Sequence, residues 1–190
     1  GTGFKLDYMY FPKHSTGDAT GDQAMSGSGT GAASKDAHDI AITGSVPGVE
    51  GLSLGVGYAK RNYDYKVAGT PKQTREDGTV YATYAYGPLT VGYQVGGVGD
   101  SGNGGAAYKN NYIGISYAVS DDLSVSYNNT ESRKLNAGYT GNTEQEWDSI
   151  SVSYSMGGMT FNVADSDCTN CSYTAAKSES ETVISLGIAL

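Results

Sequence analysis

The segment 79–95 alternates, residue by residue, between larger apolar side chains and small or polar ones, with one break at Gly87-Pro88. Successive side chains of a β-strand point to opposite faces, so this pattern predicts two strands joined by a tight turn. One face of the hairpin carries mainly Val, Leu and Tyr, and the other carries Thr, Gly, Ala and Gln. The two faces require different surroundings, either core and solvent in a soluble sandwich or lipid and a lumen in a transmembrane barrel.

The same alternation recurs along the chain and predicts ten strands. Tight turns alternate with long polar loops, which we expect at 12–35, 65–78, 96–107, 131–144 and 165–180. This connection pattern indicates an antiparallel up-and-down meander whose long loops all lie at one end. The expected strands are 3–11, 40–46, 52–59, 79–86, 89–95, 113–119, 123–128, 149–156, 159–164 and 184–190.

Composition favours a membrane barrel over a soluble core. The 190 residues include 16 Tyr but only 3 Phe, and the mean hydropathy is -0.38, whereas a soluble domain of this size normally draws more on Leu, Ile and Phe. No run approaches the roughly 20 apolar residues of a membrane helix, but strands of about 9–11 alternating residues can also span a bilayer. We therefore predict a single all-β domain, residues 1–190, that forms an antiparallel up-and-down transmembrane β-barrel.

The connections and the tyrosines support the barrel. Compact soluble domains favour short connections, whereas outer-membrane barrels combine short turns at one end with long loops at the other. Tyr86, Tyr117 and Tyr154 each lie shortly before a tight turn, where the lipid-facing aromatic girdle of such a barrel is expected. The second face is mostly Ser, Gly, Ala and Thr. A closed barrel of ten or more strands lined by such small groups would enclose a void, which we expect water to fill.

Charge and motif content argue against several classes of protein. A net charge of -8 and a pI near 4.6 argue against a nucleic-acid partner, which needs a basic patch. His14 and His38 are isolated and have no metal-ligand spacing, so no metal site is expected. No nucleophile elbow, Ser-His-Asp set or nucleotide-binding loop is recognisable. We therefore expect neither an enzyme nor a cofactor.

The two cysteines, Cys168 and Cys171, form a lone Cys-x-x-Cys pair. A zinc site would need a second pair of ligands, and a redox enzyme would need a βαβ setting. We therefore predict a local disulfide in a surface loop, which would suit an oxidising compartment.

Two alternatives to a channel remain open from these patterns. The first is a non-conducting outer-membrane surface barrel, an adhesin or structural protein whose long extracellular loops bind a ligand. The second is a soluble, lectin-like β-sandwich, which would bury Tyr84, Leu89, Val91 and Tyr93 in a core.

The chain resembles the general-diffusion porins of Gram-negative bacteria, in particular the C-terminal part of a sixteen-stranded porin of the α-proteobacterial type. The resemblance rests on the hairpin 84–93, the Ser-Val-Ser-Tyr strands at 124–127 and 151–154, and the strand 183–190. It implies a homotrimer in the bacterial outer membrane, in contact with lipid and lipopolysaccharide, through which small hydrophilic solutes and ions diffuse passively. By this resemblance we expect the ten strands to be the last ten of sixteen, so that the chain is incomplete at its N-terminus and lacks the family's constriction loop. A complete ten-stranded barrel is the alternative, since even strand numbers from eight upward occur.

The parity of the alternation predicts which side chains would line the pore. The charged members, Lys5, Asp7 and Arg61, would bias which ions enter, although solvated positions near strand ends explain them equally well. Lys60 is expected on the lipid side of the same strand as Arg61, where it could reach lipid headgroups. The predicted pore-lining residues are Lys5, Asp7, Arg61, Thr90, Gln94, Ser116, Ser126, Asn128, Ser151 and Asn162.

Overall fold

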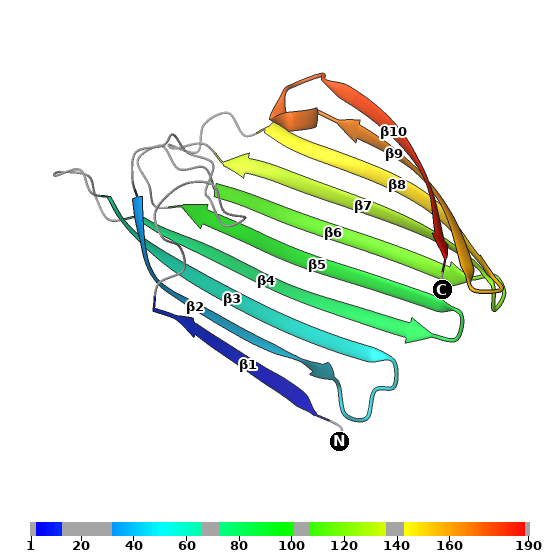
Figure 1. The fold of residues 1–190 in the computed structure, drawn as a ribbon, viewed down its shortest axis with the longest axis horizontal. Helices are drawn as coiled ribbons and strands as arrows, with labels where there is room; N and C mark the ends of the chain where they lie inside the picture. The colour runs from blue at the N-terminus through cyan, green and yellow to red at the C-terminus, as the bar shows by residue number, and fades with distance from the viewer. Residues whose placement is uncertain (1–2, 13–31, 66–72, 101–106, 136–142, 189–190) are drawn as a thin grey trace.

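The computed structural model describes residues 3–12, 32–65, 73–100, 107–135 and 143–188, which form one ten-stranded antiparallel sheet in sequence order (Figure 1). The predicted all-β, up-and-down arrangement is confirmed. The elements are β1 (Phe4–Phe11), β2 (Ala32–Ser45), β3 (Leu52–Tyr65), β4 (Gln73–Tyr86), β5 (Leu89–Asp100), β6 (Ala107–Ala118), β7 (Leu123–Leu135), β8 (Thr143–Met156), β9 (Met159–Thr169), a 3₁₀ turn η1 (Cys171–Tyr173) and β10 (Ser178–Ile188).

The sheet forms a curved wall that is open at its edges (Figure 1). Each strand pairs with its neighbours in the sequence, so β1 pairs with β2 and β10 with β9, and the two edge strands do not pair with each other. Short turns connect β2 to β3, β4 to β5, β6 to β7 and β8 to β9 at one end of the wall. In the last of these, Gly157 and Gly158 both have positive φ, which a tight two-residue hairpin turn requires and glycine adopts at little cost.

The pairing register divides the side chains into two continuous faces. Residues opposite one another in an antiparallel pair share a face, and alternation along each strand keeps the faces separate across the sheet. The face that carries Val80, Val91, Ile115, Val125 and Val152 is apolar, and we call it the outer face. The opposite face, which we call the inner face, is hollowed and carries mostly small and polar residues, among them Thr79, Gln94, Ser116, Ser126 and Ser151.

The wall has no hydrophobic core of the kind that a soluble domain needs. Within the described residues, the buried hydrophobic side chains are Ala37, Cys168 and Cys171. The predicted sandwich alternative is wrong, because the sheet is a single layer, Tyr84 and Tyr93 are exposed, and Leu89 and Val91 are only partly covered. The apolar outer face therefore needs a non-aqueous neighbour outside the chain.

Several strands extend further into the long connections than the apolar alternation predicts. β3 continues to Tyr65 and β4 begins at Gln73, although 65–78 was expected to be a loop. The extension is polar, and opposite charges face each other across it, with Lys60 Nζ 3.2 Å from Glu76 Oε1. Cross-strand pairs of opposite charge favour continued pairing where apolar residues have run out. The expected loops 96–107, 131–144 and 165–180 are shortened in the same way, by β5, by β7 and β8, and by β9 and β10.

In the described part of the chain, no helix is long and apolar enough to cross a membrane.

Candidate channel wall

A row of hydroxyl groups crosses the inner face in the half of the wall near the short turns. Thr90, Ser116, Ser126 and Ser151 occupy paired positions on β5, β6, β7 and β8. Ser126 Oγ lies 2.7 Å from Ser151 Oγ. A hydroxyl has one hydrogen and two acceptor lone pairs, so each group in such a pair keeps capacity to bond water or a polar solute.

Small residues limit how far side chains project from the inner face of the sheet. Gly55, Gly57, Gly92 and Gly114 have this orientation on β3, β5 and β6. Gly55 is required by its neighbour, since a Cβ atom built there would lie 2.2 Å from Cε1 of Tyr81, whose ring covers the glycine. The Tyr81 ring therefore lies against the backbone of Gly55, and a larger residue at position 55 would displace the ring.

Two adjacent hollows lie along this face. The larger, of about 370 Å³, is lined by polar residues, among them Asp7, Asp39, Asp77, Gln94 and Asn110, together with small and apolar residues such as Gly57, Met9 and Val98. The second, of about 340 Å³, shares Gln94 and Tyr112 with the first, so the two are continuous along the wall, and its further lining includes Tyr81, Asn128 and Thr130.

Several charged groups on the inner face have partners of opposite charge. Asp77 accepts a 2.9 Å hydrogen bond from Arg61 on the next strand and a 3.1 Å hydrogen bond from Arg75 on its own strand. At the edge of the sheet, Lys5 Nζ lies 2.9 Å from Asp7 Oδ1, with both side chains largely exposed. The predicted charges of Lys5, Asp7 and Arg61 are therefore locally compensated.

Sequence reasoning missed Arg75 and Asp77, because it assigned 65–78 to a loop. A signal was available: the basic pair Lys60-Arg61 and the acidic pair Glu76-Asp77 come close together when the hairpin continues past the apolar residues, with Lys60 directly opposite Glu76 and Asp77 diagonal to Arg61. It also missed Asp39, whose Oδ1 is buried with no hydrogen-bond partner in the described part of the structure.

The register places all ten predicted pore-lining residues on the inner face and brings most of them into adjacent rows. Asn128 lies opposite Gly114 and Ser149, while Asn162 lies opposite Ser153 and Ser185. Lys5 and Asp7, on the edge strand β1, stand apart from the row of hydroxyl groups.

A family comparison agrees with this two-faced wall. Residues 2–180 match the model of a Gram-negative porin family. The chain belongs to this porin family. Comparison with individually curated proteins gives no match. The family and the strand-rich fold place this porin in the bacterial outer membrane.

The outer face of the porin has two zones. Near the short turns, Tyr86, Tyr117 and Tyr154 are exposed, and Tyr86 reaches 72% exposure. Toward the other end the outer face becomes polar: Lys60 pairs with Glu76, and the Tyr127 hydroxyl donates to Asp148. Lys60 therefore lies on the expected face and has a protein partner there.

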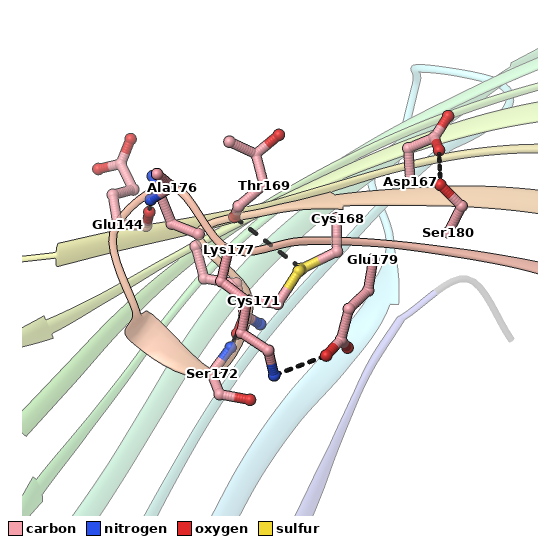
Figure 2. The surroundings of a disulfide bond; sticks show 12 residues. Glu144, Asp167, Cys168, Thr169, Cys171, Ser172, Ala176, Lys177, Glu179 and Ser180 are labelled. Carbon is pink, nitrogen blue, oxygen red and sulfur yellow. Dashed lines mark hydrogen bonds and ion pairs between the residues drawn. A yellow bond between two sulfur atoms is a disulfide. The ribbon is translucent and has the colours of Figure 1, made fainter.

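The cysteines of the porin are bonded to each other, as predicted. The prediction that they lie in a surface loop is wrong, because both are buried. Cys168 and Cys171 form a disulfide and are only 2% and 1% exposed (Figure 2). Cys168 points to the inner face, opposite Trp147 and Glu179 in the register, and the turn that follows folds back over that face. The sequence pattern contained no sign of this, because it did not fix on which side of the wall the connection would lie.

Among the residues that the structure describes, no group of three or more His, Cys, Asp or Glu side chains could hold a metal ion. His38 is engaged instead on the outer face, where its Nδ1 lies 2.8 Å from the hydroxyl of Tyr8. His14 lies outside the described residues.

Proposed function

We propose that this porin forms a water-filled channel through which small hydrophilic solutes and ions diffuse passively across the outer membrane. The observation that carries the proposal is the division of one sheet into an exposed apolar face and a hollowed polar face. In a soluble protein the apolar face would be covered; in a barrel it meets lipid while the polar face encloses water.

Passage needs no chemical step and no moving part. The hydroxyl row of Thr90, Ser116, Ser126 and Ser151, with Gln94, Asn128 and Asn162 beside it, offers hydrogen bonds that replace part of a solute's hydration. Hydroxyl and amide groups both donate and accept, so they bind neither sign of charge strongly. The proposed channel therefore passes polar solutes with little chemical discrimination.

The charged part of the inner face would add little preference for either sign of ion. Lys5 and Asp7 form a compensated pair, whereas Asp77 bonds both Arg61 and Arg75, which leaves one positive charge uncompensated. Asp39 lines the larger hollow beside them, and one of its carboxylate oxygens has no hydrogen-bond partner in the described structure. A carboxylate at the wall attracts cations and repels anions, so Asp39 offsets the charge of the second arginine.

The outer face would contact lipid and the acyl chains of lipopolysaccharide. Exposed side chains such as Ile115 and Val152 suit the hydrocarbon region, and Tyr86, Tyr117 and Tyr154 suit the interface near the short turns. By family membership we also propose a homotrimer, and we propose no nucleic-acid partner for a chain of net charge -8.

The test is the current through the native, full-length protein, purified in detergent and added to a planar bilayer. The proposal predicts stepwise increases in conductance, with a reversal potential in a salt gradient that indicates little selectivity between cations and anions. If protein shown to be inserted carries no current, the channel proposal is overturned and the surface barrel with ligand-binding loops is favoured.

A further inference from the structure

The connection between β9 and β10 lies at the end of the wall opposite the short turns (Figure 1). We call residues 168–177 the disulfide turn. β9 ends at Thr169, η1 follows at once, and β10 begins at Ser178. Figure 2 shows η1 on the same side of the strands as the Cys168 side chain, which is the side of the inner face.

Tyr173 anchors the disulfide turn to distant strands. Its hydroxyl lies 2.7 Å from Ser132 Oγ on β7, and its ring centroid is 5.5 Å from that of Tyr108 on β6. Lys134 Nζ of β7 lies 5.8 Å from the same ring, within the range of a cation–π contact. Ser132 lies opposite Asn110, which lines the larger hollow, so these contacts are on the inner face.

The reach of the turn follows from the strand order. From β9 it crosses β8 and β7 to contact β6, and three strand spacings of roughly 4.8 Å cover about 14 Å of wall. Tyr173 itself is partly exposed and Ser172 is exposed. The turn therefore adds a second layer of chain on the side that the proposed channel uses.

The backbone of the turn is fixed at several points. Ser172 N–H donates a 2.7 Å hydrogen bond to Gln145 Oε1, and the Asn170 side chain donates to the Glu144 carbonyl oxygen and accepts from Ala176 N–H at 3.0 and 2.9 Å. Asn170, Ser172, Tyr173 and Ala176 all have φ between 53° and 62°, a region that residues other than glycine avoid. Such a backbone persists only where its surroundings hold it, which here are these bonds and the disulfide.

We propose that the disulfide turn is a fixed constriction at the mouth of the channel, and that Tyr173 sets how far it projects over the wall. The inference rests on the proposed function, since only an open channel can be narrowed. The turn reduces the cross-section at the end of the long connections and excludes solutes that the rest of the wall would admit.

The test compares single-channel conductance and the largest poly(ethylene glycol) that enters the channel. Tyr173→Ala removes the ring that reaches β6 and β7, and the double variant Cys168→Ser, Cys171→Ser removes the tether. Both are expected to raise the conductance and admit larger polymers. Tyr173→Phe keeps the ring but loses the bond to Ser132, so it should give a smaller rise.

The matched control is Tyr84→Ala, which removes an exposed ring of the same size from the outer face. Its conductance per channel should equal that of the wild type. Conductance is measured on channels that have inserted, so reduced folding of a variant lowers the number of events and leaves their size informative.

The outcomes separate the two proposals. A conducting wild type whose conductance and polymer limit are unchanged in both turn variants would overturn the constriction and leave the channel intact. A wild type that inserts without conducting would overturn both.

Discussion

Val152 and Ser151 are neighbours on β8, yet they belong to opposite faces with opposite chemistry. Val152 lies between Val125 and Val163, and it is exposed. Ser151 lies between Ser126 and Ala164, with its hydroxyl bonded to Ser126. The difference shows that in this porin the exposed fraction of a side chain does not tell which face contacts water. The residue types on each face identify the water-facing side, because the apolar face is exposed only in the absence of lipid.

The strongest way to break this comparison is to place the same charge on each face. Val152→Lys puts an ammonium group where lipid is expected and should reduce the free energy of unfolding by about 1–4 kcal/mol, the cost rising with depth in the bilayer. Ser151→Lys puts it where water is expected and should change stability far less. Urea unfolding in lipid vesicles, followed by Tyr and Trp fluorescence, measures both. Equal losses in the two variants would contradict the assignment of the faces.

A substitution at Gly55 tests how tightly the Tyr81 ring packs against the inner face. Gly55→Ala would place Cβ 2.2 Å from Cε1 of Tyr81, so the ring must shift. We expect a loss of about 1–3 kcal/mol from this overpacking and a lower conductance as the ring moves toward the hollow that it lines.

Gly57→Ala is the control for this substitution. Its Cβ would meet Thr79 Cγ2 at 3.4 Å, an ordinary contact. If Gly55→Ala is as stable and as conductive as Gly57→Ala, the position of the Tyr81 ring affects neither stability nor conductance, and the prediction is wrong.

The compensated charges of the inner face predict a change of selectivity with little change of stability. Asp77→Asn leaves Arg61 and Arg75 without their carboxylate and should shift the reversal potential toward anions, while Arg61→Gln should shift it toward cations. Each ion pair is partly exposed, so the stability effect should be about 1 kcal/mol or less. Shifts in the same direction for both variants would rule out a role of these charges in the lumen.

The smallest expected effect concerns one hydroxyl group. Ser126→Ala removes the 2.7 Å bond to Ser151. If water reaches the inner face, Ser151 rehydrates and stability should fall by at most about 1 kcal/mol, whereas a hydroxyl left dry and unpaired costs about 1–3 kcal/mol. Thermal unfolding in detergent distinguishes these cases. Ser153→Ala, which removes another inner-face hydroxyl group from β8, is the comparison variant.

Much of the fold follows from the sequence because a strand has an exact period of two. Val91 and Ile115 were assigned to one face and Thr90 and Ser116 to the other, and the register pairs them as expected. The alternation also predicted the short turns, since Gly157-Gly158 interrupts it at a point where only a tight turn fits.

The features that the sequence did not reveal depend on contacts between distant segments. β3 and β4 extend through pairs such as Arg61–Asp77, which an apolar pattern does not register. The inward position of the disulfide turn depends on Tyr173 meeting Ser132, 41 residues earlier in the chain, and no local pattern encodes that contact. Local periodicity thus predicts strands and faces, while the shape of the lumen depends on side chains that meet only after folding.

The most direct test of the two faces uses single cysteines at adjacent positions of β6, Ser116→Cys on the inner face and Ile115→Cys on the outer face. Cys168 and Cys171, the two cysteines of this sequence, are bonded to each other, so neither competes for the reagent. A membrane-impermeant cationic thiol reagent is added while single channels are recorded. We expect a stepwise fall in current for Ser116→Cys and no change for Ile115→Cys; the reverse pattern, or an equal response at both positions, would contradict the assignment of the two faces.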